Sequence, residues 1–373
     1  MATNNGLALG LLEATQLTRA GRLLEATAVI ERVLRQQPIS ETVCDDHASD
    51  RGGATSRVIE GVFSKVVDSS QRQDANDVLE GRAGGFIAGS YTNQEGTRPY
   101  KLYVPTGYIG QALPMVVMLH GCTQTADDFA AGTRMNVLAE ERQCFVLYPA
   151  QTGSANRSRC WNWFKRAHQR RDKGEPAIIA GMTREVLKRY CIDARKVYVA
   201  GLSAGGAMAA VMGAAYPDLY AAVGIHSGLP VGSAHDLPSA FAAMRGAPPA
   251  SPAGTAAGSA PRALPAIVFH GDRDATVHPR NGEQVVSQCV ERNSELIDIM
   301  VQQGQVPGGH AYTRRVHRDA EGRVVLERWE VHGAGHAWFG GSTRGSYTDP
   351  KGPDAAREMM RFFCEDAAHG GKA

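Results

Sequence analysis

The sequence predicts an α/β fold built on a doubly wound, mostly parallel β-sheet. One observation is a series of short, nearly all-apolar runs, which suit strands that are buried on both faces of a sheet. These runs are residues 115–119, 145–149, 197–203, 221–228 and 266–271. The other observation is that segments long enough for helices separate the runs, and strands that alternate with helices are typical of a parallel sheet.

The predicted helices have apolar residues at helical spacing. They cover residues 126–141, 176–190, 204–216 and 281–292. Ahead of the first parallel strand, residues 85–108 predict two paired strands with a turn near Gly96. Residues 323–331 predict the last strand of the sheet.

Other segments precede or interrupt this domain. Residues 1–38 predict a helical hairpin, because two segments with helical spacing are separated by a glycine and end at a proline. Residues 39–84 contain few aromatic side chains and predict a poorly ordered linker. The main domain then covers residues 85–373. Within it, residues 244–265 are rich in Pro, Ala, Gly and Ser and predict a surface insertion, either a passive loop or a lid.

Charge and hydropathy exclude several classes of protein. The 40 basic and 38 acidic residues leave a net charge of +2, which gives no reason to expect a nucleic acid or an anionic membrane as partner. No run approaches the roughly 18 apolar residues of a membrane span. The N-terminus lacks a basic segment and a small-residue cleavage site, so we expect no signal peptide and favour the cytoplasm. Seven cysteines in so long a chain do not indicate a disulfide framework.

The strongest functional signal is a G-x-S-x-G motif formed by Gly201, Ser203 and Gly205. It lies between a predicted strand and a predicted helix, where this motif makes a sharp turn that presents a nucleophilic hydroxyl. Glycine is needed at both flanking positions, because side chains there would clash in such a turn. The N-terminus of the following helix favours negative charge that develops nearby. We therefore predict that Ser203 is a catalytic nucleophile and not part of an ordinary glycine-rich turn.

A serine hydroxyl needs a base, and the base needs an acid that orients it. Asp272 and Asp274 follow the fifth apolar run. Asp274 is favoured, because the acid must extend past the end of the strand toward the histidine. His332 and His336 follow the last predicted strand, and the glycines around His336 favour it as the base, since they allow a tight loop. A metal site at the two histidines is disfavoured, because Gly-Ala-Gly between them does not suit a helix.

Acyl transfer also needs N–H donors for the negative charge that forms on oxygen. The usual donors are the N–H after the nucleophile, here Ala204, and an N–H on the loop after an earlier strand. Residues 120–124 form that loop, and we predict the backbone N–H of Cys122 as the second donor.

Three side chains near these motifs are predicted to contact substrate. They are Trp161, Trp338 and His120. Tryptophan rings beside a catalytic histidine suggest an apolar cleft for an acyl group or ring. For Trp338 we favour such a cleft over ordinary core packing.

Taken together, the motifs resemble the polyhydroxybutyrate depolymerase family of esterases, which includes relatives that act on feruloyl and acetylxylan esters. The similarity covers about residues 85–365. It is carried by Leu119-His120-Gly121-Cys122-Thr123-Gln124, Cys160-Trp161-Asn162-Trp163, Gly201-Leu202-Ser203-Ala204-Gly205-Gly206, His270-Gly271 with Asp274 and Val277, and Gly335-His336-Ala337-Trp338.

The resemblance implies an α/β-hydrolase fold with a Ser203–Asp274–His336 triad, with Cys122 in the oxyanion hole and with no cofactor or metal. It implies ester substrates: polyhydroxybutyrate-type polyester, its 3-hydroxyacyl oligomers or small acyl esters. Feruloyl and acetylxylan esters, peptide bonds, and a non-catalytic granule-binding role are the alternatives. Many relatives are secreted and often carry a separate substrate-binding domain, and neither feature is visible here, which favours soluble substrates. The hairpin at residues 1–38 is then expected to bind a polymer granule or to mediate self-association.

A disulfide between Cys122 and Cys160 is a further prediction. Each cysteine lies on a loop after one of two neighbouring strands, and the carboxyl ends of such strands bring their loops together. The expectation of a cytoplasmic protein argues against the bond. Both outcomes stay open from the sequence.

Overall fold

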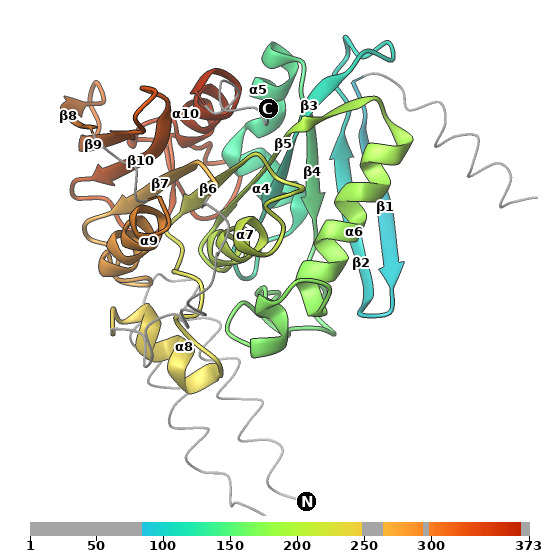
Figure 1. Cartoon of the computed structure of the whole chain (residues 1–373), viewed down its shortest axis with the longest axis horizontal. Helices are drawn as coiled ribbons and strands as arrows, with labels where there is room; N and C mark the ends of the chain where they lie inside the picture. The colour runs from blue at the N-terminus through green and yellow to red at the C-terminus, as the bar shows by residue number, and fades with distance from the viewer. Residues whose placement is uncertain (1–83, 248–263, 294–297, 367–373) are drawn as a thin grey trace, which may run out of the picture. The chain divides into compact units, whose positions relative to one another are not determined.

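The computed structural model describes residues 84–247, 264–293 and 298–366, which form one large sheet with helices on both faces (Figure 1). The predicted hairpin at 1–38, all but the last residue of the predicted linker at 39–84 and most of the 244–265 insertion lie outside the described residues. The ten strands of the sheet follow the order β1-β2-β4-β3-β5-β6-β7-β10-β9-β8. In chain order they are β1 Phe86–Asn93, β2 Gly96–Tyr103, β3 Leu113–Leu119, β4 Phe145–Pro149, β5 Ile192–Leu202, β6 Ala222–His226, β7 Ala266–Gly271, β8 Asp298–Gln305, β9 Ala311–Arg318 and β10 Val324–Val331.

The centre of the sheet is parallel and buried. The five apolar runs of the sequence become β3 to β7. In the sheet these strands lie in the order β4-β3-β5-β6-β7 and pair in parallel, and β10 pairs in parallel with β7. Every residue of β4, β6 and β7 is buried. This agrees with the prediction, because a strand covered by helices on both faces has no solvent-exposed position, and its few polar side chains, His226 and His270, are hydrogen-bonded in the core.

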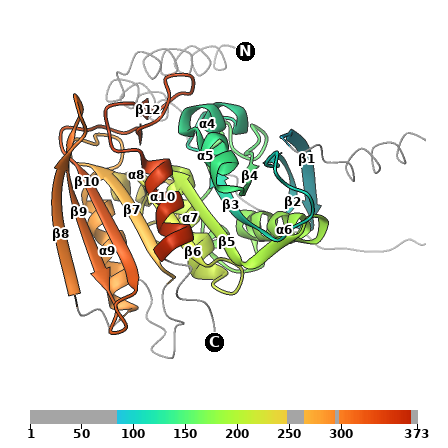
Figure 2. The ribbon, with the colours of Figure 1, turned by 90° about the horizontal axis from the view of Figure 1, so that it is seen from above.

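The two ends of the sheet are antiparallel. At one end β1 and β2 form the predicted hairpin, and at the other end β8 and β9 extend the sheet beyond β10 (Figures 1 and 2). The sequence analysis missed β8 and β9. Their residues include glutamines, arginines and a glycine instead of an apolar run, because these strands are only partly covered.

Helices cover the two faces of the sheet. One apolar cluster joins one face of the strands to α6 (Gly174–Arg189), α7 (Ala204–Ala215) and α9 (Arg280–Glu291). A second cluster joins the other face to α4 (Ala126–Thr133), α5 (Met135–Arg142) and α10 (Ala355–Arg361). Neighbouring strand residues alternate between the clusters: Val116 belongs to the second and Val117 to the first.

The helices differ from the predictions in several details. The segment 126–141 forms two helices, because Arg134 takes a left-handed conformation with φ of 56° that ends α4 and begins α5. A helix at α8 (Leu237–Met244), the helix α10 and the π-helical turn at Phe362–Asp366 were not predicted. Nowhere in the described ranges is there a helix with the length and apolar character needed to cross a membrane.

Because β3 to β7 and β10 run parallel, the loops that follow them meet at one edge of the sheet. These loops carry every residue that the sequence analysis singled out for catalysis. A two-stranded sheet of β11 (Trp338–Phe339) and β12 (Thr348–Asp349) supports the last of these loops.

Candidate active site

Ser203 lies at the sharp turn between β5 and α7, with φ of 58° and ψ of −120°. This is a conformation that a residue with a side chain rarely adopts. The turn is held by the N–H of Ser203, which donates to the carbonyl of His226 at 2.9 Å. A Cβ at Gly201 or Gly205 would collide with the backbone of Leu119, which explains the need for glycine on both sides.

Asp274 follows β7, and its carboxylate is fully buried. One oxygen, Oδ2, accepts a hydrogen bond from Nδ1 of His336 at 2.7 Å. The other oxygen, Oδ1, accepts from the backbone N–H groups of Thr276 and Val277 at 2.9 and 2.8 Å. Burial by itself raises the pKa of this carboxyl, but the interactions with His270 and His336 outweigh it and hold the pKa well below its ordinary value. Asp274 is therefore an ionised acceptor that fixes the ring of His336.

The two residues that competed in the sequence analysis are paired with each other. His332 Nδ1 lies 3.1 Å from Asp272 Oδ2, and the N–H of Gly333 donates to Asp272 Oδ1 at 2.7 Å. The side chains of Asp272 and His332 are 34% and 40% exposed, whereas those of Asp274 and His336 are 0% and 9% exposed. The structure thus contains two Asp–His pairs: Asp272–His332 is partly exposed, and Asp274–His336 is buried.

His226 joins the Ser203 turn to the loop at residues 332–339, here called the His336 loop. Its carbonyl accepts from Ser203, as described above, and its ring Nε2 accepts from the backbone N–H of Phe339 at 3.1 Å. The ring is buried against Trp338 and Phe269, with centroid separations of 5.0 and 5.6 Å. These contacts bring Ser203 and the loop that carries His336 to the same point at the sheet edge.

The loop at residues 120–124, here called the Cys122 loop, lies against the Ser203 turn. A Cβ placed on Gly121 would lie 3.7 Å from the Cβ of Ser203. In the described part of the chain, no hydrogen bond engages the backbone N–H of Cys122 or of Ala204. Ala204 is the first residue of α7, so its N–H is one of those that a helix leaves without an internal partner. Both N–H groups are available to an oxygen bound beside Ser203.

The buried side chain of His120 joins the Cys122 loop to Gln151 by hydrogen bonds. Its Nδ1 donates to the carbonyl of Gly121 at 2.8 Å, and its Nε2 accepts from the backbone N–H of Gln151 at 3.0 Å. Burial lowers the pKa of His120 to about 4, so the ring is neutral at physiological pH.

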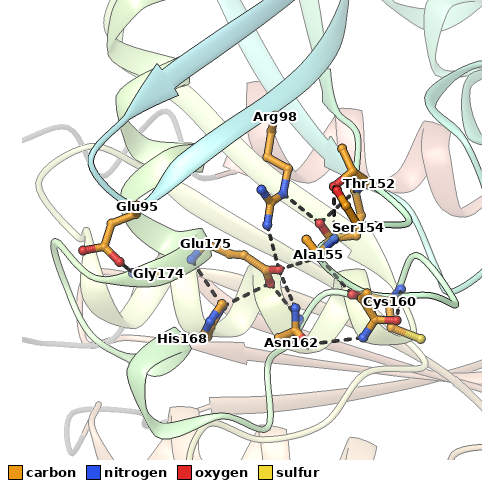
Figure 3. A network of polar contacts seen from close by, with 12 residues as sticks. Glu95, Arg98, Thr152, Ser154, Ala155, Cys160, Asn162, His168, Gly174 and Glu175 are labelled. Atoms are coloured by element: carbon orange, nitrogen blue, oxygen red, sulfur yellow. Dashed lines mark hydrogen bonds and ion pairs between the residues drawn. The ribbon is translucent and has the colours of Figure 1, made fainter.

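A covalent bond joins the Cys122 loop to its neighbour, and a buried carboxylate holds that neighbour. Cys122 and Cys160 form a disulfide with a Cα–Cα distance of 4.2 Å. Glu175, at the start of α6, accepts from the backbone N–H and the side-chain amide of Asn162, both at 2.7 Å (Figure 3). It also accepts from the side-chain amide of Gln151 and pairs with Arg98 at 3.4 Å. Burial opposes ionisation of Glu175, but the hydrogen bond and charge of His168 and the amide donors leave its pKa below the ordinary value.

The side chains of Trp161, Trp338 and His120, which the sequence predicts to contact substrate, are buried in the structure. Their exposed fractions are 0%, 1% and 1%. Trp161 packs beside the His120 ring at a centroid distance of 5.5 Å, and Trp338 packs between Phe129 and His226. These side chains support the loops from inside the core, because the loops fold over them.

The sequence analysis missed Glu175, Gln151 and His226. Glu175 had no signal, since a glutamate at the start of a helix is usually solvated. His226 had one: a histidine that closes an apolar run is placed at the end of a buried strand, where only a hydrogen-bonded ring is tolerated.

Comparisons with known proteins agree with this geometry. The family described as "Esterase PHB depolymerase" matches residues 98–305. The chain is 34% identical to "Poly(3-hydroxyalkanoate) depolymerase C" of Paucimonas lemoignei, over 65% of this chain and 59% of that protein. It is 30% identical to "Feruloyl esterase B" of Neurospora crassa, over 67% of this chain and 82% of that protein.

Among solved structures, the acetyl xylan esterase from Aspergillus awamori aligns with a TM-score of 0.54 at 21% identity, over 67% of this chain and 94% of that one, which shows a shared fold. The chain spans 59% and 48% of the lengths of two depolymerase relatives. With the α/β-hydrolase sheet, the strained serine turn and the family match in agreement, this chain belongs to the polyhydroxybutyrate depolymerase family of esterases.

Proposed function

We propose that this protein hydrolyses carboxylic esters through a covalent acyl-enzyme on Ser203. The observation that carries the proposal is the buried hydrogen bond of 2.7 Å between Asp274 and His336, on a loop that His226 ties to the strained Ser203 turn. Nucleophile, base and orienting acid follow each other in the chain order of the fold class.

In the first half of the reaction, Oγ of Ser203 attacks the ester carbonyl carbon while Nε2 of His336 takes the hydroxyl proton. The N–H groups of Cys122 and Ala204 stabilise the negative charge that forms on the carbonyl oxygen. The carbon–oxygen bond to the alcohol then breaks, and the alcohol leaves with the proton from His336. The acyl group stays on Ser203.

In the second half, water attacks the acyl carbon and His336 takes a proton from it. The bond to Ser203 breaks, the proton returns to the serine oxygen, and the carboxylic acid leaves. Asp274 stays ionised throughout, because its interactions with histidines hold its pKa low, and it stabilises the imidazolium that forms in each half.

For the substrate we favour polyhydroxybutyrate-type polyester, its 3-hydroxyacyl oligomers or small acyl esters. The family match and the 34% identity to a polyhydroxyalkanoate depolymerase support this class. A feruloyl or acetylxylan ester is the second candidate, because the chain covers more of the feruloyl esterase relative, 82%, than of either depolymerase. A serine peptidase of the same fold is a third.

A panel of esters separates these candidates. It contains p-nitrophenyl butyrate, 3-hydroxybutyrate oligomers, polyhydroxybutyrate particles, methyl ferulate, acetylated xylan and a peptide p-nitroanilide. We expect the highest kcat/KM on hydroxybutyrate oligomers, and a preference for methyl ferulate or acetylated xylan would reassign the substrate.

The matched control is Ser203→Ala, which removes only the hydroxyl. It should lower kcat by about 10⁴-fold or more, since removal of a triad member has effects of that size. Its thermal unfolding should stay close to that of the wild type. A Ser203→Ala variant that retains near-wild-type turnover contradicts the mechanism.

A further inference from the structure

His226 is a buried imidazole at the junction of the three strands that lead to the candidate active site. It ends β6 and pairs with Leu202, the residue before Ser203, on β5. Its neighbour on the other side is Phe269 of β7, whose strand leads to Asp274. The ring is 0% exposed, so no solvent reaches its nitrogens.

Hydrogen bonding fixes the tautomer of this ring. A backbone N–H can only donate, so Nε2, which lies 3.1 Å from the N–H of Phe339, must carry the lone pair. The proton is therefore on Nδ1, which faces the hydroxyl of Ser227 at 3.2 Å. Protonation of Nε2 would place two N–H groups against each other in the core.

The environment keeps the ring in this neutral state. Burial lowers the pKa of His226 well below its ordinary value, and positive charge on His270 or His336 would lower it further. The flat faces of the ring stack on Phe269 and Trp338, with interplanar angles of 9° and 23°. The ring can therefore neither charge nor rotate without loss of packing.

The two ends of His226 act on two different parts of the site. Its carbonyl oxygen accepts from the N–H of Ser203 at 2.9 Å and so supports the strained turn. Its ring accepts from Phe339, three residues after His336. On its other side the His336 loop is bonded to Tyr347, the residue before β12, through Trp338 N–H to the Tyr347 carbonyl at 2.7 Å. The contact through Nε2 ties the His336 loop directly to β6, the strand beside that of the nucleophile.

We propose that His226 is a positioning residue, which sets the His336 loop relative to Ser203 by accepting the Phe339 N–H at its neutral Nε2. This inference rests on the proposed function, because it concerns the base of that reaction. A phenylalanine in its place would fill the same space but leave the Phe339 N–H without a partner in the core. The loop would then shift, and a displacement of about 1 Å at a reacting group can lower the rate about 100-fold.

The test compares three variants with p-nitrophenyl butyrate as substrate. His226→Phe keeps a ring and removes the acceptor. His226→Gln keeps an acceptor, because its amide oxygen reaches the position of Nε2. Phe269→Leu weakens the ring stack without a change in any hydrogen bond and serves as the control for lost packing. For each variant kcat, KM and the thermal unfolding midpoint are measured at a temperature where the protein is folded.

We expect His226→Phe to lower kcat about 10- to 100-fold with little change in KM. His226→Gln should restore kcat to within a few-fold of the wild type, and Phe269→Leu should retain kcat even where its unfolding midpoint falls as far. A loss of kcat that follows the unfolding midpoint across all three variants, or a glutamine that rescues nothing, would overturn the inference.

A spectroscopic readout covers the case in which His226→Phe does not fold. In wild-type protein labelled with ¹⁵N-histidine, Nε2 of His226 should be non-protonated and coupled to the Phe339 N–H across the hydrogen bond. A proton on Nε2 overturns the inference whatever the variants do. Wild-type protein without Ser203-dependent esterase activity would overturn the proposed function, and the inference with it.

Discussion

The Cys122 loop and the His336 loop both reach the Ser203 turn, yet different chemistry holds them. The Cys122 loop is bonded to its neighbour by a disulfide, and the network around ionised Glu175 holds that neighbour through Asn162. The His336 loop is held by imidazoles, through the pairs with Asp272 and Asp274 and through His226. The first loop presents backbone N–H groups that need only a fixed direction. In the proposed reaction, the second presents a base that gains and loses a proton, so the residues that hold it must tolerate a change in charge.

The largest effect in this comparison should come from Asp274. Asp274→Asn should lower kcat about 10⁴-fold, because an amide at this position lets the His336 ring take the wrong tautomer. The matched control is Asp272→Asn, two residues away in the partly exposed pair, which should change kcat by no more than about three-fold, since exposed pairs contribute little. Steady-state kinetics on p-nitrophenyl butyrate measures both. A crippled Asp272→Asn beside a mild Asp274→Asn would exchange the roles of the two carboxylates.

The next effect tests the support of the loop that neighbours the Cys122 loop. Glu175→Gln should lower the free energy of unfolding by about 3–5 kcal/mol, because it removes the charge opposite buried Arg98 and sets an amide against donors that need an acceptor. Urea unfolding measures the loss. Glu95→Gln, at a more exposed carboxylate beside the same helix, should cost less than about 1 kcal/mol. Equal losses of unfolding free energy in the two variants would show that the buried network around Glu175 stabilises the protein no more than an exposed carboxylate does.

The disulfide, which joins that neighbouring loop to the Cys122 loop, gives an expected effect of similar size. The double variant Cys122→Ala/Cys160→Ala should lose about 4 kcal/mol of unfolding free energy, since the bond closes a separation of 38 residues. Below its unfolding transition the variant should keep most of its esterase activity, because the Cys122 contribution comes from a backbone N–H. Thiol titration of unreduced wild-type protein checks that the bond exists. Seven titratable thiols in that protein would show that the disulfide is absent.

Low pH should lower the free energy of unfolding through protonation of His120, which lies in the core next to the Cys122 loop. Its folded pKa of about 4 lies below the ordinary value of about 6.5, so the unfolded chain takes up the proton first as the pH falls. The stabilisation is complete above about pH 6.5 and declines toward pH 4, by about 2–3 kcal/mol at pH 4.5. Unfolding free energies between pH 7.5 and 4.5 should therefore fall less steeply in His120→Gln than in the wild type. Parallel pH profiles for the two proteins would contradict this role.

The sequence alone determined the central strands and the nucleophile turn. The apolar runs that became β3 to β7 could only be buried strands, because each is too short for a helix and carries no polar face. Ser203 follows from local geometry, since Gly201 and Gly205 are required by the backbone beside them. Asp274 and His336 were found by chain order and by resemblance, helped by the reach of Asp274 past the strand tip and by the glycines around His336.

Only the tertiary structure decided which aspartate faces which histidine, because Asp272 and His332 offer the same chemistry two and four residues away. It also placed β8 and β9, whose many polar residues leave no apolar run in the sequence and which are stabilised by pairing beside β10, with Val316 of β9 buried. The roles of Glu175 and His226 were likewise decided by the tertiary structure. A buried carboxylate or imidazole is tolerated only when distant parts of the chain supply its hydrogen bonds, and those partners exist only after the sheet has formed.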